Sequence, residues 1–394
     1  MKFLLIYVPN LRFSQFIEPW NNYIVSELLT TFPTNSLSWD QLVENQDSSL
    51  KNLHYGLIHN GFETTCITGE NQLFPYIKHS FIPTKYALIQ NGDLILADAS
   101  EDRKDVGRPV EMLDIGNQKI VSGLHTIHAR NKTDLIVNGF KGFYFQSSAM
   151  KQQIFKIANG SKIYGISSSA FSELKMFIPE KQEQKKIVDL MIKIEERIQT
   201  QSKIIDDYNS LKMGIYNCMF KENCADYKLK QLANIVKGDQ INNNQLLSNG
   251  SYYMMNGGTL PSGYLDSYNV SENTISISEG GNSCGYVQFN KERFWSGGHC
   301  YTIQNVNPLI VENKYLYHYL KHKEKEIMNL RIGTGLPNIQ KKDLENFTIF
   351  VPNLLIQRKN LALFEMLDEK ICILNEELER LEKQKKYLLR NLFI

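Results

Sequence analysis

Apolar residues recur three and four positions apart in two long stretches of the chain. Each stretch follows a proline, Pro179 or Pro352, which suits the first turn of a helix, and neither contains a later proline. In both stretches the apolar positions form one narrow line, which is typical of the heptad seam of a coiled coil. The predicted interface residues are Ile187, Met191, Ile194, Ile198, Ile205, Tyr208 and Ile215 in the first stretch, and Phe364, Leu367, Ile371, Leu374, Leu378, Leu381 and Leu388 in the second.

About forty residues of helix, at 1.5 Å per residue, make a rod roughly 60 Å long. A narrow apolar seam is unstable alone in water, so we expect the two rods to pack on each other as an antiparallel coiled coil. The alternative is that both helices lie inside one core. That alternative is disfavoured because a buried helix is apolar over a wider face.

The two stretches are copies of one element. Residues 350–393 repeat residues 177–220 at a constant offset of 173 positions. Lys212 and Lys385 interrupt the seam at the same place in both copies, and a single polar residue in a seam can fix the register of a coiled coil. A period this long indicates a duplicated domain, because the repeats of a solenoid are much shorter.

Outside these stretches the pattern changes to short β-like runs separated by turns. The predicted strands are residues 52–59, 86–90 and 93–97 in the first such part, and 273–278, 285–289 and 300–304 in the second. Short helices are predicted at residues 22–32, after Ser147, and at residues 313–330. The two parts match each other only faintly, chiefly where Ser122-Gly123-Leu124-His125 returns as Ser296-Gly297-Gly298-His299.

The predicted fold class is therefore α+β, with a pseudo-two-fold internal repeat. Two mixed, mostly β domains are joined by two long helices that form an antiparallel coiled coil. The predicted boundaries are 1–36 for an N-terminal arm, 37–176 for the first domain, 177–221 for the first helical spacer, 222–349 for the second domain and 350–394 for the second spacer.

Composition and charge add little constraint. A formal net charge of +2 does not demand a polyanionic partner, although charge that faces DNA can be local or supplied by other subunits. The six cysteines show no short paired spacing, which favours reduced thiols. The apolar run at residues 3–8 is shorter than a signal peptide requires, and no stretch approaches the length of a membrane span. We expect a cytoplasmic protein.

Motifs of catalysis and metal binding are missing from the sequence. It has no phosphate-binding Gly-x-x-x-x-Gly-Lys-[Ser/Thr] loop, and the glycine-rich residues 279–285 lack the dinucleotide-binding spacing. His299 and Cys300 have no short ligand pair to anchor zinc with Cys284. Residues 307–310 lack the proline and the aromatic residue with which amino-methyltransferases hold a flipped adenine. We therefore expect a protein without catalysis and without a metal.

Two histidines deserve separate mention. His318 and His322 lie four positions apart on a predicted helix, which is the spacing of a zincin pair. The residue after His318 is Tyr319 rather than glutamate, so we expect both histidines on a solvated helix face.

Binding chemistry is easier to find than catalytic chemistry. In the first domain Tyr55, His59 and Asn60 are predicted on a strand and its edge, and a polar loop carries Arg103, Lys104 and Arg108. Such side chains can contact phosphate oxygens or guanine edges, although a solvated loop with internal ion pairs explains them equally well. In the second domain the candidates lie next to glycines in the sequence. Asparagine side chains there could read adenine, although a role in structural turns explains the same residues about as well. They are Tyr253, Asn256, Tyr264 and Asn282.

The order of these features resembles the specificity subunit of type I restriction-modification enzymes. Each helical stretch begins with Phe-[Ile/Val]-Pro followed by Gln-[Lys/Arg]-Lys. No single motif is decisive, but their order is specific and covers essentially the whole chain. The other stretches that carry the resemblance are Leu11-Arg12-Phe13 with Trp20, His54-Tyr55-Gly56-x-Ile58-His59, residues 92–102, Gly123-Leu124-His125, Asn256-Gly257-Gly258, Ser262-Gly263-Tyr264 and Glu279-Gly280-Gly281.

The resemblance implies a DNA-recognition subunit without catalytic activity. Each β-rich domain would be a target recognition domain that reads one half of a bipartite double-stranded DNA sequence, and the coiled coil would set the spacing. Two methyltransferase subunits would dock on this chain and carry S-adenosylmethionine, and motor-nuclease subunits would complete the enzyme. The chain itself would bind no cofactor.

Two alternatives to this reading belong to other classes of protein. One is a coiled-coil scaffold whose two β-rich heads bind protein or glycan. The other is a free-standing methyltransferase or nuclease.

Overall fold

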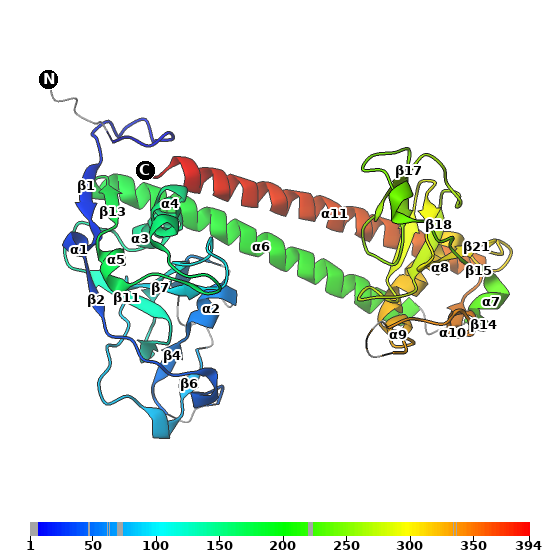
Figure 1. Ribbon diagram of the computed structural model, residues 1–394, viewed down its shortest axis with the longest axis horizontal. Helices are drawn as coiled ribbons and strands as arrows, with labels where there is room; N and C mark the ends of the chain where they lie inside the picture. The colour runs from blue at the N-terminus through cyan, green and yellow to red at the C-terminus, as the bar shows by residue number, and fades with distance from the viewer. Residues whose placement is uncertain are drawn as a thin grey trace. The chain divides into compact units, whose positions relative to one another are not determined.

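The structure is a computed structural model that describes residues 7–45, 48–60, 62, 64–68, 74–219, 224–333, 335 and 337–394 (Figure 1). The chain divides into two compact units. Met1–Ser202 and Glu376–Ile394 form the first, and Lys203–Asn375 form the second. The start of the predicted apolar run, and the predicted boundary between residues 221 and 222, lie outside the described residues.

The first unit is built around a five-stranded sheet in the order β2-β11-β7-β9-β5. The central strand β7 is buried along its whole length and pairs antiparallel with both neighbours. These strands are β2 (Leu29–Phe32), β11 (Thr126–Asn131), β7 (Leu94–Ala97), β9 (Pro109–Asp114) and β5 (Cys66–Thr68). A smaller sheet in the order β10-β4-β6-β3 contains β10 (Ile120–Ser122), β4 (Lys51–Leu53), β6 (Tyr76–Ile77) and β3 (Leu42–Val43).

Two short ladders and several helices complete the first unit. The ladders pair β1 (Asn21–Ile24) with β13 (Lys175–Ile178), and β8 (Ala99–Ser100) with β12 (Tyr164–Gly165). The helices are α1 (Val25–Leu28), α2 (Tyr55–Asn60), α3 (Phe140–Gln146), α4 (Ser148–Ile157) and α5 (Ser168–Ser172), with 3-10 turns η1 (Trp39–Gln41) and η3 (His79–Phe81).

The second unit repeats the order of the main sheet. Its strands run β15-β21-β18-β19, and β18 pairs antiparallel with β21 and β19. They are β15 (Asn234–Lys237), β21 (Cys300–Gln304), β18 (Thr274–Ser278) and β19 (Val287–Asn290). A smaller sheet in the order β17-β16-β20 contains β17 (Gly263–Leu265), β16 (Tyr252–Met255) and β20 (Trp295–Ser296).

The remaining elements of the second unit also have counterparts in the first. β14 (Ala225–Lys228) pairs antiparallel with β22 (Thr348–Val351), as β1 pairs with β13. The helices are α7 (Leu229–Leu232), α8 (Asn313–His322), α9 (Glu324–Met328) and α10 (Lys341–Glu345), with a 3-10 turn η4 (Asn243–Gln245). Each unit is therefore a mixed α/β structure with the same central strand order.

Two long helices contribute to both units. α6 (Lys181–Met219) and α11 (Leu354–Asn391) are 39 and 38 residues long. Inside the first unit Glu195 of α6 pairs with Lys385 of α11, and inside the second Lys212 of α6 pairs with Asp368 of α11. In the first unit the start of α6 and the end of α11 both bind the chain at Leu11 and Arg12, through Glu183 and Asn391, and in the second unit the rings of Tyr216 of α6 and Phe364 of α11 have centroids 4.4 Å apart. Within each unit the residue number therefore rises along one helix as it falls along the other, so the two helices run antiparallel there.

The core of the first unit forms where these helices meet α3. Residues Phe140–Phe145 of α3 are all buried, and the four aromatic residues among them share a hydrophobic cluster with Met191 of α6 and with Phe393. The Tyr144 hydroxyl donates to the carbonyl of Ile394 at 2.7 Å and accepts from the amide of Phe177 at 2.8 Å. One buried tyrosine thus joins the end of the chain to strand β13.

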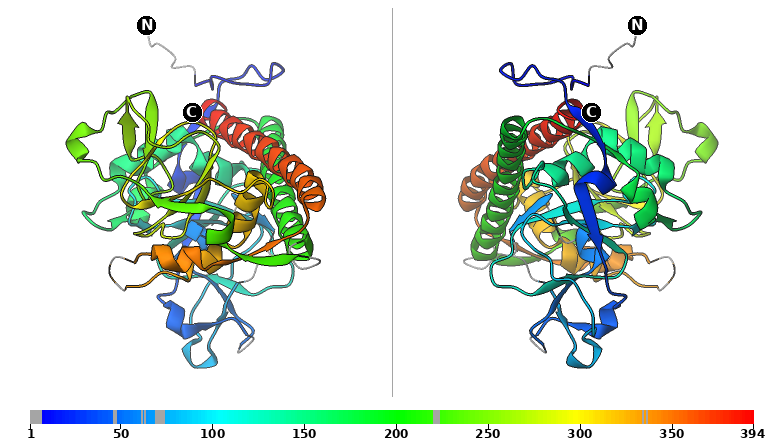
Figure 2. Two further views of the ribbon diagram at one scale, coloured as in Figure 1. Left: turned by 90° about the vertical axis from the view of Figure 1, so that its right-hand side faces the viewer. Right: turned by 90° about the vertical axis from the view of Figure 1, so that its left-hand side faces the viewer.

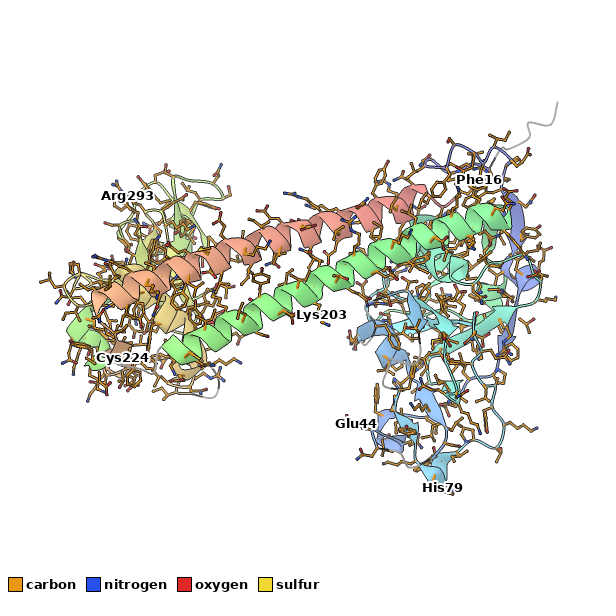
Figure 3. All side chains as sticks on the ribbon, turned by 180° about the vertical axis from the view of Figure 1, so that it is seen from behind. Phe16, Glu44, His79, Lys203, Cys224 and Arg293 are labelled. Carbon is orange, nitrogen blue, oxygen red and sulfur yellow. The ribbon has the colours of Figure 1, made fainter. Side chains whose placement is uncertain are left out.

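Residues 7–20 lie at the same end of the long helices (Figure 2). The amide of Leu11 donates to the carbonyl of Asn391 at 2.9 Å. Arg12 binds both carboxylate oxygens of the buried Glu183, at 2.8 and 2.7 Å. Lys186 of α6 lies over the rings of Phe13 and Phe16. Phe16 is labelled in Figure 3. The bidentate contact explains how a buried carboxylate is tolerated at the start of α6.

Several element predictions were wrong, each for a local reason. Residues 52–59 are not one strand, because Nδ1 of His54 accepts from the amide of Gly56 at 3.1 Å and the chain turns into α2. Residues 86–90 form only an isolated bridge at Leu88, and residues 22–32 are helical only at Val25–Leu28, between β1 and β2. The helix predicted at residues 313–330 breaks at Lys323. The other predicted strands correspond to β7, β18, β19 and β21.

Candidate nucleic-acid interface

The candidate residues of the first unit gather around α2 and the loop that follows β7. The ring of Tyr55 makes edge contacts with His59 and His125, at centroid distances of 5.9 and 5.3 Å. Arg108 donates to the carbonyl of His59 at 2.8 Å, from the far end of the loop. Because α2 replaces the predicted strand, Tyr55 and His59 lie one helical turn apart on the same face.

His59 is the anchor of this cluster. Its Nδ1 lies 2.6 Å from the carboxylate of Asp105 and its Nε2 lies 3.0 Å from the carbonyl of Ala99. The hydrogen bond to Asp105 is the main reason that the pKa of His59 is raised, and it outweighs the effect of burial. A ring that donates from both nitrogens is positively charged, so His59 ties α2 to the loop rather than offering a free nitrogen to a ligand.

The pKa of the neighbouring His54 is shifted in the opposite direction, downward. This histidine lies between the rings of Trp39 and Tyr55, and burial, helped by the charge of His125, lowers its pKa to about 4. Its Nδ1 accepts a hydrogen bond, as a neutral ring can. His54 is therefore a neutral packing residue under the cluster.

The other candidates of the first unit do not join this cluster. The guanidinium of Arg103 stacks on Phe155 at 4.2 Å and donates to the carbonyl of Phe155 at 3.1 Å, which docks the loop on α4. Lys104 and Asn60 are exposed. Tyr55, His59 and Arg108 are thus brought together, whereas Arg103 has a structural contact of its own.

The second unit has a hollow of about 610 Å³ at the corresponding edge of its sheet. Asn256, Glu279 and His299 lie in its wall. The carboxylate of Glu279 binds Lys237 at 2.6 Å and the hydroxyl of Tyr301 at 3.0 Å. The side chain of Asn256 accepts from the amide of His299 at 2.9 Å, so its oxygen supports the wall.

The remaining candidates of the second unit differ in their exposure. Tyr253 stacks on Phe294 with an angle of 10° between the rings, and its hydroxyl donates to Asn290 at 3.2 Å. Burial raises the pKa of Tyr253 to about 12. Tyr264 pairs with Tyr253 across β16 and β17 and is half-buried, and Asn282 is exposed. Tyr253 is therefore part of the packing rather than a free recognition group.

Two exposed histidines were missing from the sequence candidates. Nδ1 of His125 lies 3.4 Å from Asp98, and Nδ1 of His299 lies 3.6 Å from Glu279. Burial raises the pKa of Asp98, and His125 partly offsets that effect. The repeated Ser-Gly-x-His sequence was the signal that could have identified both histidines.

The predicted seam of the long helices lies on their covered sides. Every residue predicted in the seam is buried or half-buried. Lys385 and Glu195 approach to 2.7 Å, and Glu195 also accepts from the amide and hydroxyl of Thr65. The interrupting lysines of the two copies therefore both bind a carboxylate on the other long helix.

His318 corrects one expectation from the sequence. Its side chain is 4 % exposed, and its Nδ1 lies 2.9 Å from the hydroxyl of Tyr216. Burial is the main cause that lowers its pKa to about 4, and Asp368 acts in the opposite direction. His318 thus belongs to the core where α8 meets α6 and α11, and not to a solvated face.

Among the residues that the structure describes, no group of three or more His, Cys, Asp or Glu side chains is placed to hold a metal ion. Nor does any helix among these residues have the length and apolar character needed to cross a membrane.

The sequence of this chain matches a known protein family. The model of the family described as "Type I restriction modification DNA specificity domain" matches residues 77–207 and 221–383, which is more than half of the chain. A protein of Mycoplasma pneumoniae described as a type I specificity subunit is 34% identical over 152 residues, which cover 38% of this chain and 40% of that protein. One of Mycoplasma genitalium with the same description is 34% identical over 121 residues, 31% of each chain. The matches thus span less than half of the length of these relatives.

The fold has a solved counterpart. The crystal structure of a type I restriction-modification S subunit from M. genitalium superposes with a TM-score of 0.64 at 16% identity, covering 98% of this chain and 99% of that one. At this identity the likeness shows a shared fold.

Proposed function

Since this chain belongs to the family of type I restriction-modification DNA specificity domains, we propose that it is the DNA-recognition subunit of such a system. In this proposal the chain performs no catalysis itself. Residues 37–176 and 222–349 are the two target recognition domains, each reading one half of a bipartite double-stranded DNA sequence. Residues 177–221 and 350–394 are the helical spacers, and residues 1–36 are an N-terminal arm.

The observation that carries the proposal is that the family match extends over both units, whose central sheets have the same strand order. The side chains at the corresponding edges of these sheets differ. The first unit presents Tyr55 and Arg108, whereas the second presents Asn256 and Lys237. Two sheets with the same strand order but different exposed side chains are suited to recognising two different half-sites.

The long helices are proposed to form one antiparallel coiled coil that sets the distance between the half-sites. Support comes from two ion pairs between the helices, Lys212 with Asp368 and Lys385 with Glu195. Lys212 corresponds to Lys385 in the repeat, and Glu195 corresponds to Asp368, so the same pair of positions is joined twice. Such pairs fix the register of one helix against the other. Two methyltransferase subunits are proposed to dock on these helices and on the recognition domains.

Those partners are proposed to supply the chemistry. S-adenosylmethionine would be bound by the methyltransferase subunits, and motor-nuclease subunits would join them for restriction. The proposal assigns no cofactor to this chain.

An exchange of one domain tests the proposal. Residues 37–174 are replaced by the corresponding residues of a relative with a different target, which leaves the β1–β13 ladder intact. The hybrid is produced with its methyltransferase partners, and methylated adenines are mapped across the host genome. We expect one half of the methylated sequence to change while the other half and the gap stay the same. A change in both halves, or no methylation at a bipartite site by the unaltered chain, would contradict the proposal.

A further inference from the structure

Each unit carries a histidine beside a carboxylate at the end of its central strand pair. In the first unit His125 precedes β11, and Asp98 follows β7. Nδ1 of the ring lies 3.4 Å from the carboxylate, and the amide of Asp98 donates to the carbonyl of His125 at 3.0 Å. The side chain of His125 is 50% exposed and that of Asp98 is 29% exposed, so the ring is the more accessible of the two.

The second unit repeats this arrangement. His299 precedes β21, and Glu279 follows β18. Nδ1 of His299 lies 3.6 Å from the carboxylate, and the amide of Glu279 donates to the carbonyl of His299 at 2.9 Å. The ring is 60% exposed and the carboxylate 11% exposed, at the wall of the hollow described above.

The backbone around the two pairs is equivalent as well. The carbonyl of Asp98 accepts from Ile166 at 2.9 Å, and the carbonyl of Glu279 accepts from Ile339 at 2.8 Å. Ile166 and Ile339 are separated by the repeat offset of 173 positions. The pairs therefore occupy one and the same place in the duplicated fold.

The glycine of the Ser-Gly-x-His sequence fixes the approach of each histidine. The amide of Gly123 donates to Leu53 at 2.9 Å, and the amide of Gly297 donates to Met255 at 2.8 Å. A Cβ on Gly123 would lie 2.8 Å from the Leu53 carbonyl oxygen, and one on Gly297 would lie 2.6 Å from Oδ1 of Asn256. A side chain on Gly123 would therefore meet backbone, and one on Gly297 would displace the side chains of Met254 and Asn256. Each histidine thus follows a glycine whose amide is bound to a strand of the small sheet.

We propose that His125 and His299 each donate a hydrogen bond to a backbone phosphate of the DNA half-site that their unit reads, with Asp98 and Glu279 orienting the rings. This inference rests on the proposed function and adds residues to it. In each ring Nδ1 lies on the side of the carboxylate, which leaves Nε2 to donate to a phosphate oxygen.

The features that are the same in both units favour a phosphate over a base edge as the ligand. The surroundings of the two histidines differ, with Tyr55 against one ring and Asn256 bonded to the backbone of the other. The histidine, its carboxylate and the glycine before it are the same in chemistry. A contact that is kept while the surrounding surface changes suits what every half-site shares, which is the sugar-phosphate backbone.

The test compares H125N and H299N with the unaltered chain, each in complex with its methyltransferase partners. Asparagine is chosen because His125 has a φ of 53°, a conformation that asparagine tolerates. H79N, at an exposed residue of the first unit, is the matched control. Affinity is measured on a duplex with the methylated target, on one with the first half-site scrambled and on one with the second scrambled. Urea unfolding confirms that each variant is folded, and D98N and E279Q test the orienting carboxylates.

We expect H125N and H299N each to weaken binding about tenfold, by the same factor on all three duplexes, as the loss of one charge-assisted hydrogen bond would. The methylated sequence should not change, D98N and E279Q should weaken binding less, and H79N should have no effect. Unchanged affinity would overturn the assignment. So would a loss confined to duplexes with the unit's own half-site intact, or a changed methylated sequence, because either result indicates base reading. Failure of the unaltered complex to methylate a bipartite site would instead reject the proposed function.

Discussion

At the scale of single residues, hydrogen-bond partners and burial together decide the role of each histidine. His59 donates to Asp105 and to a carbonyl, and its pKa is raised. His318 is enclosed by Tyr216 and Phe364, and its pKa is lowered to about 4. The sequence could not distinguish these cases, because Tyr216 lies 102 positions from His318 and reaches it only through the packing of α6 on α8.

The buried state of His318 predicts a loss of stability in acid. The ring of an unfolded chain titrates near pH 6.5, whereas the folded chain takes up this proton only near pH 4. The unfolded state therefore binds more protons between these values, so the contribution to stability is complete above about pH 6.5 and falls as the pH drops toward 4, by at most about 3 kcal/mol.

The H318N variant keeps an acceptor for the hydroxyl of Tyr216 but does not titrate. We expect the free energy of unfolding, measured with urea at a series of pH values, to fall less steeply in H318N than in the unaltered chain. H79N, changed at an exposed ring of the first unit, is the control and should follow the unaltered chain. Parallel curves for H318N and the unaltered chain would show that His318 does not titrate in this range.

At the scale of elements, the two long helices carry the same ion pair twice, once buried and once partly exposed. Lys385 and Glu195 have side chains 16% and 4% exposed, and Glu195 is also bound by Thr65. Lys212 and Asp368 occupy the same positions of the repeat, but Asp368 is 41% exposed. A buried pair is costly to break, because the remaining charge is left without a partner, whereas an exposed pair contributes little.

The K385M variant should therefore destabilise the chain by about 3 kcal/mol, and the matched K212M by less than about 1 kcal/mol. Adding E195Q to K385M should restore much of the loss, because glutamine still accepts from Thr65 and carries no charge. The measurement is the free energy of urea unfolding for the single and double variants. Equal effects of K385M and K212M would show that burial does not separate the two pairs.

The elements that could be predicted from the sequence are those that a local pattern of side chains specifies. The three-four spacing predicted helices close to the observed α6 and α11, and short β-like runs between turns predicted β7, β18, β19 and β21. The errors fell where a single contact redirects the chain, as when His54 accepts from Gly56 and starts α2 instead of extending β4. Such a contact has no periodic pattern, so hydrophobic spacing cannot reveal it.

At the scale of the whole molecule, the duplication is clear in the sequence of the helices and faint in the two β-rich parts of the chain. A seam requires apolar residues at fixed positions, so the two copies of the helix remained alike. A sheet order is kept by backbone hydrogen bonds, which allow the side chains to change, and β7 and β18 occupy equivalent central places with few shared residues. The sequence therefore predicted two domains but located the candidate site incompletely, missing the paired His125 and His299.

The proposed spacing role makes a prediction about the recognised DNA. Ser202 and Asn375 are separated by the repeat offset, so four residues added after each lengthen α6 and α11 at equivalent places. One added turn extends a helix by about 6 Å, and a coiled coil accommodates a four-residue insertion by a local change of winding. With roughly 3.4 Å between base pairs, the gap in the methylated sequence should lengthen by about one or two base pairs.

The two specific half-sites should remain the same in that variant, because the insertion leaves both sheets untouched. Mapping methylated adenines in a host that carries the variant measures the gap and the half-sites together. Four residues added after Leu260, which is 75% exposed, provide the control and should leave the gap unchanged. An unchanged gap in the helix variant, with methylation retained, would mean that the helices do not set the spacing. The distance between half-sites would then have to come from the partner subunits.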